Sequence, residues 1–240
     1  MTHHDLSRPH LYDHRHSDVS SGWLRAAVFG AMDGLVSNVG LIAGIAAAGA
    51  APGIVVITGV SGLIAGAVSM ALGEYASVRT ANDQLDAEMR TEIEAHARNP
   101  EGEEAELARR FERMGMEHEI AVVAASQVHT STDNAVRLHL MQELGLRPDD
   151  KPSPWVAAFS SFLSFGVGAL IPIVPFFFAF GTLGWALAFG GVGLLIAGGL
   201  AARFTRRNWI AGACRQLLFG GIAVAATYTI GMLLGVSSLA

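Results

Sequence analysis

The chain has 240 residues, a formal net charge of −5, 51% hydrophobic residues and 28 glycines, and its mean hydropathy is +0.40. A soluble globular domain of this size has too little polar surface for so much apolar material, so the composition indicates a helical membrane protein that crosses the bilayer several times. Cys214 is the sole cysteine, which excludes an intrachain disulfide and a cysteine-based metal site.

The first 22 residues form a polar tail that contains five histidines. Because the tail lacks an apolar core, we expect no cleaved secretory signal peptide and expect the first membrane span to direct insertion. The histidines could bind metal weakly, although a solvated polar tail is the simpler interpretation.

Five apolar stretches are each long enough to cross a hydrocarbon core, which takes about 20 helical residues. They occupy residues 23–48, 53–75, 155–180, 184–204 and 209–237. The sequence therefore predicts an all-α polytopic membrane protein with five transmembrane helices and a helical domain inserted between helices 2 and 3. We divide the chain into the tail (1–22), two spans (23–80), the inserted domain (81–150) and three spans (151–240).

Residues 81–150 contain seven Arg, no Lys and sixteen Asp or Glu. No Gly or Pro interrupts residues 79–97, so we expect the second span to continue into this domain as one helix. Asn99, Pro100 and Glu101 then supply an N-cap, a proline and an acid for the start of a new helix. That helix should end by Gly115, and two more are expected over residues 117–128 and 130–145.

The distribution of positive charge predicts the topology, because cytoplasmic loops of membrane proteins are rich in Lys and Arg. With five spans, the tail, the inserted domain and the basic loop around residues 203–207 fall on one side. The opposite loops and residues 232–240 contain no Lys or Arg. We expect a cytoplasmic N-terminus, a cytoplasmic acidic domain and a C-terminus on the opposite side.

Asp33 lies in the middle of the first apolar stretch, where an acid costs about 2.5 kcal/mol or more and is a functional candidate by default. Ser37 follows on the same helical face at i+4, and Asn38 is adjacent. The alternative is an aspartic acid that is protonated or hydrogen-bonded to a neighbouring span. A row of glycines would let another helix approach closely: Gly30, Gly34, Gly40 and Gly44.

Met70 and Glu74 stand four residues apart in the second span and so share a helical face. A thioether beside a carboxylate offers a soft and a hard ligand to a borderline cation such as Fe2+. The pair alone is weak, because Met usually packs and Glu74 lies near the interface. Together with Asp33, however, the pair makes three potential ligands on two consecutive spans, which can line one pathway.

The inserted domain is rich in carboxylates, which suit hard or borderline cations. Glu103 and Glu106 share a face at i, i+3, and an antiparallel turn at Pro100 would bring Glu92 of the preceding helix toward them. A solvated acidic face paired with Arg109, Arg110 and Arg113 is an equally weighted alternative.

Other classes of site find little support in the sequence. No His in the acidic domain follows a Glu by three residues, which argues against a ferritin-like di-iron site. No nucleophile motif, phosphate-binding glycine loop or basic groove is present, so we expect neither an enzyme nor a nucleic-acid-binding protein, and no prosthetic group.

Several motifs resemble the vacuolar iron transporter family, over about residues 23–235. They are DGLVS at residues 33–37, SMALGEY at 69–75, ELGL at 143–146, GALIP at 168–172 and RQLL at 215–218. The resemblance implies a homodimer with the translocation path between its subunits, and a cytoplasmic domain that collects Fe2+, with Mn2+ as a further substrate and protons in exchange. In that family an acid in the first span and a Met in the second line the path, and Asp33 and Met70 match them, with Glu74 close by.

The resemblance also implies a ligand set in the inserted domain. The family has glutamates spaced around the proline that starts its second helix, and Glu92, Glu103 and Glu106 match this spacing. The fourth place holds Ala95, which Glu94 and His96 flank.

Near the end of the domain, Glu143 matches the glutamate of the family's ELG motif. Two family methionine positions ahead of it hold His139 and Leu140, with Met141 one place later. We therefore expect the family's metal-binding domain with an altered ligand set, to which Glu94, His139 and Met141 contribute less.

Two functional hypotheses follow. The first is a transporter that exports Fe2+, or Mn2+, from the cytosol or into a storage compartment by proton antiport. The second is a membrane-anchored metal buffer or sensor that moves no ion, against which Asp33 argues, because a mere anchor needs no acid in its span. An anion or organic solute carrier fits poorly with acidic and soft ligands. Richness in Ala, Gly and Arg with one Lys favours a bacterial plasma membrane.

Overall fold

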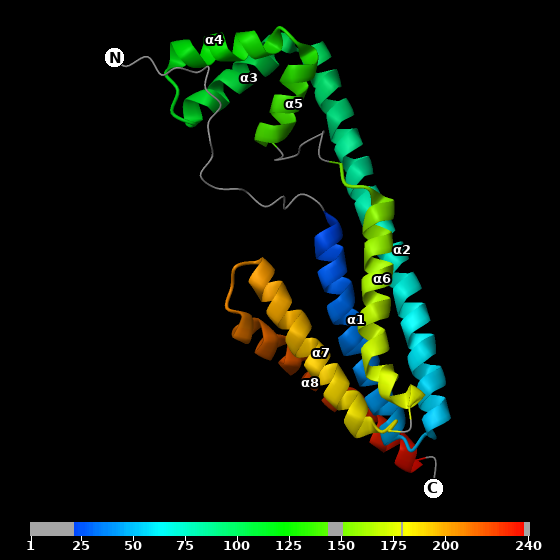
Figure 1. Cartoon of the computed structure of the whole chain (residues 1–240). Helices are drawn as coiled ribbons and strands as arrows, with labels where there is room; N and C mark the ends of the chain where they lie inside the picture. The colour runs from blue at the N-terminus through cyan, green and yellow to red at the C-terminus, as the bar shows by residue number, and fades with distance from the viewer. Residues whose placement is uncertain (1–21, 144–150, 179, 238–240) are drawn as a thin grey trace.

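The computed structural model describes residues 22–143, 151–178 and 180–237, and the elements in these ranges are all helical (Figure 1). They are α1 (Gly22–Ala47), α2 (Pro52–Arg98), α3 (Pro100–Arg113), α4 (His118–His129), α5 (Thr132–Glu143), α6 (Pro154–Leu170), the 3-10 helix η1 (Ile171–Phe177), α7 (Leu183–Phe204) and α8 (Trp209–Ser237).

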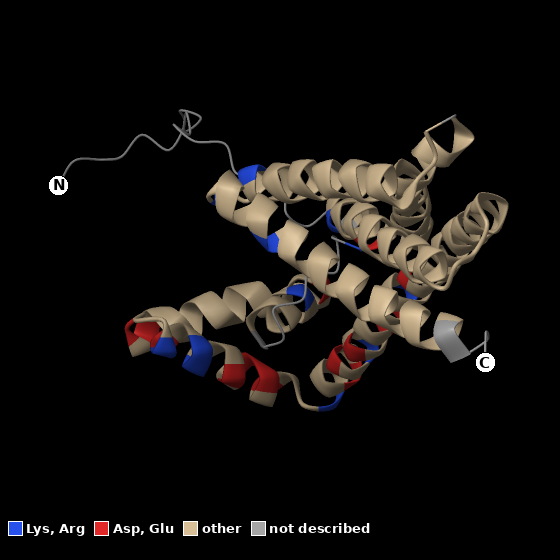
Figure 2. Ribbon diagram, turned by 90° about the horizontal axis from the view of Figure 1, so that it is seen from below, with Lys and Arg blue, Asp and Glu red and all other residues tan. Residues whose placement is uncertain are grey.

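Five of the described segments are long and apolar enough to cross a membrane: α1, α2, α6 with η1, α7 and α8. The prediction of an all-α polytopic membrane protein is thus confirmed. The acidic residues of the described segments are concentrated on the second half of α2 and on α3 to α5, and the red segments in Figure 2 gather there.

Helix α2 is 47 residues long, which corresponds to about 70 Å at about 1.5 Å per residue. A hydrocarbon core is only about 30 Å thick. The second half of α2 therefore extends beyond the membrane, as predicted, and α3, α4 and α5 gather at its far end (Figure 1). We call these three helices and the part of α2 after residue 80 the inserted domain.

Helix α1 is the centre of the membrane bundle and packs against α6, α7 and α8. A Cβ on Gly34 would collide with the backbone of Phe165 in α6, and one on Gly44 would lie 3.0 Å from the carbonyl oxygen of Thr227 in α8. The Thr227 hydroxyl donates a hydrogen bond to the carbonyl of Gly40, 2.6 Å away. The predicted close approach at these glycines is confirmed.

The third span departs from the prediction of one helix over residues 155–180. The α-helix ends at Leu170 and continues as η1 to Phe177. Pro172 and Pro175 explain the change, because proline lacks the backbone N–H and its ring clashes with the carbonyl of the preceding turn. The tighter 3-10 geometry accommodates both prolines.

The helices of the inserted domain start where local signals predict. The Asn99 side chain accepts a hydrogen bond from Gly102 N at 3.2 Å and caps α3, with Pro100 in its first turn. The helix ends at Arg113, just before Gly115, which has a φ of 101°. The predicted helix end at Gly145 lies outside the described residues.

A small apolar core joins α3 to α4, in which Leu107 and Phe111 pack against Ala121 and Ala125. At the other end of the domain, the Asn82 amide donates a hydrogen bond to the carbonyl of Pro152 at 3.0 Å, and Lys151 pairs with Asp86. These contacts tie the entry of the third span to α2.

Candidate metal site in the inserted domain

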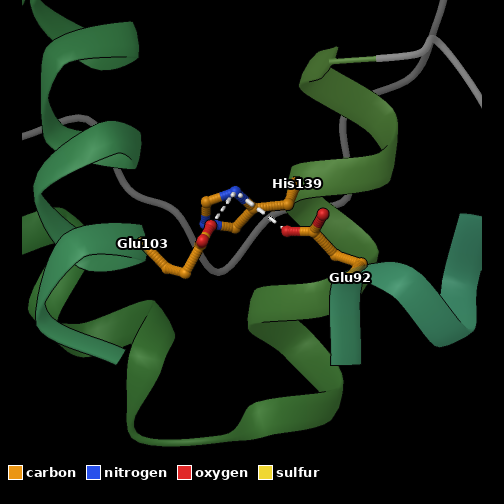
Figure 3. A group of neighbouring side chains, drawn as sticks. All are labelled: Glu92, Glu103 and His139. Carbon is orange, nitrogen blue, oxygen red and sulfur yellow. Dashed lines mark ion pairs between the residues drawn. The ribbon is translucent and has the colours of Figure 1, made fainter. Parts of the chain in front are cut away.

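Three side chains from three helices converge in the inserted domain: Glu92 from α2, Glu103 from α3 and His139 from α5 (Figure 3). His139 Nδ1 lies 3.3 Å from Glu92 Oε1 and 3.7 Å from Glu103 Oε2. One ligand atom from each residue lies within 4.8 Å of the others. Among the described residues this is the only such group of three His, Cys, Asp or Glu side chains. We call it the Glu/His triad.

Local structure explains why these residues meet. The turn at Asn99 starts α3 beside the end of α2, which places Glu103 in the first turn of α3 close to Glu92. Helix α5 packs on α2, and Leu138 rests against the apolar core of α3 and α4. The neighbouring His139 is thereby turned into the domain, where its side chain is completely buried.

The triad has the chemistry of a divalent-metal site. Metal bonds to oxygen or nitrogen of about 2.0–2.2 Å place ligand atoms within about 4.4 Å of each other, so the triad needs only a slight closure. Its Glu92 and Glu103 side chains are 14% and 19% exposed, so water screens their charge little. Carboxylates suit Mn2+ and Fe2+, and imidazole suits Fe2+ and Zn2+. A metal bound here would replace any proton on His139.

The other expected ligands of the domain lie elsewhere. Glu106 Oε1 accepts from Arg110 Nη2 at 2.8 Å, and its side chain is 40% exposed, an arrangement that matches the ion-paired alternative for this residue. Glu94 and Met141 are exposed. The Glu143 side chain lies outside the described residues.

The structure shows the surroundings of Asp33 and Met70, two of the expected ligands in the membrane spans. Ser37 Oγ donates to Asp33 Oδ1 at 3.0 Å, as its i+4 position predicts. Met70 is partly buried against Phe165 and Ala169 of α6. Asp33 and Met70 thus belong to two helices, α1 and α2, that both pack against α6.

Glu74 forms an ion pair with Arg25 of α1, with Oε1 and Nη2 3.1 Å apart. The Glu74 side chain is 16% exposed, whereas that of Arg25 is 74% exposed. The sequence analysis did not predict this ion pair, because pairing between helices depends on their relative register. A cation at Glu74 would compete with this guanidinium.

Two further histidines adjoin the triad, of which the sequence analysis noted His96 only as a neighbour of Ala95 and did not predict His129. The His129 ring of α4 lies edge-on to His139 at 5.4 Å between centroids, and the His96 ring of α2 stacks on His129 at 5.1 Å. The residues belong to separate helices, so no sequence spacing links them.

These features define the class: an all-α polytopic membrane protein with a candidate divalent-metal site on helices inserted between its second and third spans. Residues 24–232 match the VIT family, and the chain belongs to this family. The chain is 35% identical over 228 residues to a vacuolar iron transporter of Acanthamoeba castellanii, covering 92% of this chain and 82% of that protein. It is 30% identical over 223 residues to vacuolar iron transporter 1 of Eucalyptus grandis, covering 91% and 89%.

Proposed function

We propose that the protein is a membrane transporter of divalent iron, with Mn2+ as a further substrate, which moves the ion out of the cytosol in exchange for protons. The observation that carries the proposal is the Glu/His triad, in which Glu92 belongs to the helix that also crosses the membrane as the second span. The proposal is also supported by the comparisons, because the chain belongs to the VIT family and relatives similar to it are named vacuolar iron transporters.

The triad would act as the loading site. Positive charge on the tail and the basic loop supports a cytoplasmic position for the inserted domain. There the two carboxylates and the imidazole would gather the ion before it enters the membrane. The barrier would be a bacterial plasma membrane, which the richness in Ala, Gly and Arg favours, or the membrane of a storage compartment.

Asp33 would bind the ion within the bilayer. One carboxylate can hold either a proton or a metal ion, so loading the metal releases a proton and unloading takes one up. Met70 would add a thioether ligand, which favours Fe2+ over harder cations such as Mg2+. In a homodimer, these residues of both subunits would line one path.

Flux measurements separate this proposal from a metal buffer that moves no ion. Purified full-length protein in proteoliposomes should take up Fe2+ faster when the imposed pH gradient drives protons the other way, and Mn2+ should compete. A buffer or sensor would bind the same ions without any flux. Metal binding without uptake, under either sign of the pH gradient, would therefore overturn the proposal.

A further inference from the structure

The tautomer of His129 is fixed by its own helix. The Nδ1 atom lies 2.9 Å from the carbonyl oxygen of Ala125, one turn earlier in α4. A carbonyl only accepts hydrogen bonds, so Nδ1 carries the proton and donates it. In the neutral ring, Nε2 then carries a lone pair directed away from the helix backbone.

That lone pair is buried. His129 Nε2 has no hydrogen-bond partner among the described residues, and the same holds for His96 Nε2. A buried polar atom without a partner is unfavourable, so a ligand bound to either of these two nitrogens would be stabilising. Histidine that donates through one nitrogen to a backbone carbonyl is also the usual arrangement of a metal-ligating imidazole.

The rings of His129 and His96 lie next to the Glu/His triad. The His96 and His129 planes are 11° from parallel, and the His129 ring meets His139 at 86°. Helices α2, α4 and α5 thus place three imidazoles in a row, the last of which belongs to the triad.

We propose that His129 and His96 form a second, nitrogen-donor metal position beside the triad. Imidazole nitrogens bind late first-row divalent ions such as Co2+, Ni2+ and Zn2+ more strongly than Mn2+, so this position takes the late ions. Metal–nitrogen bonds of about 2.0–2.1 Å require both nitrogens within about 4 Å of each other. The His96 ring therefore turns out of the parallel stack when the ion binds.

The inference extends the proposed function and rests on it only in assigning metal ions to this domain. Its consequence is that one domain offers two unlike positions. The carboxylate-rich triad accepts Fe2+ and Mn2+, whereas the histidine pair retains later metals and keeps them out of the triad.

The test is Co2+ and Mn2+ binding to the detergent-purified full-length protein. Because tail histidines would obscure the result, the reference protein carries glutamine at those positions: His3, His4, His10, His14 and His16. His129→Phe and His96→Phe each keep an aromatic ring in the stack and remove its nitrogens. His118→Gln is the matched control, because this histidine is 79% exposed in the same domain.

Each Phe variant should bind about one Co2+ fewer per chain than the reference protein and lose part of the visible Co2+ absorption due to nitrogen ligands. Mn2+ binding should be unchanged in both. If both Phe variants match His118→Gln in Co2+ stoichiometry and spectrum, the position does not exist. Thermal melting in detergent identifies a variant that fails to fold. In that case the Co2+ binding of the other Phe variant tests the proposed position.

The closing control separates this inference from the transport proposal. The double variant Glu92→Gln with Glu103→Gln removes both triad carboxylates and leaves the histidine pair intact. Loss of Mn2+ binding in the double variant, with the Phe effects on Co2+ retained, supports two positions. Unchanged Mn2+ binding and Fe2+ flux in the double variant would contradict the proposal that the triad is the loading site. That result would leave the histidine position untouched, because the Phe variants test it independently.

Discussion

Arg25 of α1 and Glu74 of α2 are joined by an ion pair of 3.1 Å between Nη2 and Oε1. The pair links the first two spans at the end of the bundle from which the inserted domain extends. Since Glu74 belongs to the proposed ligand set, the guanidinium and an arriving metal ion would compete for the same carboxylate.

Arg25→Gln should therefore lower the apparent KM for Fe2+ uptake. Arg25 is 74% exposed, so the pair is worth less than about 1 kcal/mol and the effect should stay below about fivefold. Fe2+ uptake by proteoliposomes as a function of concentration measures it, with Arg79→Gln as the control, since Arg79 pairs with Asp83 outside the proposed path. A KM that rises in Arg25→Gln alone would contradict this competition.

Glu103→Gln should weaken metal binding by the triad about tenfold or more, because it removes one of two charged ligands. Glu106→Gln is the matched comparison on the same helix, and its effect should be under about threefold, because Arg110 holds that carboxylate. Mn2+ titration of the full-length protein by calorimetry measures both. Equal losses in the two variants would show that the binding site is not the triad.

The ion pair of Asp86 with Lys151 should make a pH-dependent contribution to the stability of the folded protein. The hydrogen bond from Lys151, followed by charge attraction from Lys151 and nearby arginines, lowers the pKa of Asp86 below its usual value of 3.8. Because the pKa of Asp86 is lower in the folded than in the unfolded protein, its ionised carboxylate stabilises the fold at any pH above the unfolded-state pKa. This stabilisation is lost as the pH falls through the folded-state pKa. Lys151→Met should thus lower the melting temperature at pH 7, and the difference from the unsubstituted protein should shrink below about pH 4. A difference that stays constant down to pH 2 would contradict this linkage.

Gly34→Ala should destabilise the membrane bundle by about 1–3 kcal/mol, because its Cβ has no room against the backbone of Phe165. Gly166→Ala in α6 is the control, since a Cβ there meets nothing within 4 Å. Melting temperatures in the same detergent compare the two. Equal stability of the two variants would mean that α1 and α6 pack less closely in solution.

Much of the fold could be predicted because its signals are local. Asn99 and Pro100 mark a helix start within a few residues, and the lack of Gly and Pro before them predicts the long α2. The third span was predicted as a single helix, because hydropathy extends through Pro172 and Pro175 and is insensitive to a change from α to 3-10 geometry. The backbone effect of proline prevailed there.

The site was only partly predictable because its residues come from three helices. The turn at Pro100 indicated that Glu92 and Glu103 would meet, whereas His139 was expected only as a minor ligand in place of a methionine. Its burial, and its contact with His129, depend on how α5 packs on α2 and α4. Such packing follows from tertiary contacts that no spacing along the chain records.

In the proposed mechanism, Asp33 carries the metal ion through the bilayer in exchange for protons. The direct test is simultaneous measurement of Fe2+ uptake and proton movement in proteoliposomes that contain either the unsubstituted protein or Asp33→Ala. Asp83→Asn, an exposed acid on the extramembrane part of α2, is the control. We predict that Asp33→Ala abolishes both fluxes while Asp83→Asn retains them. Undiminished Fe2+ uptake by Asp33→Ala would contradict the account.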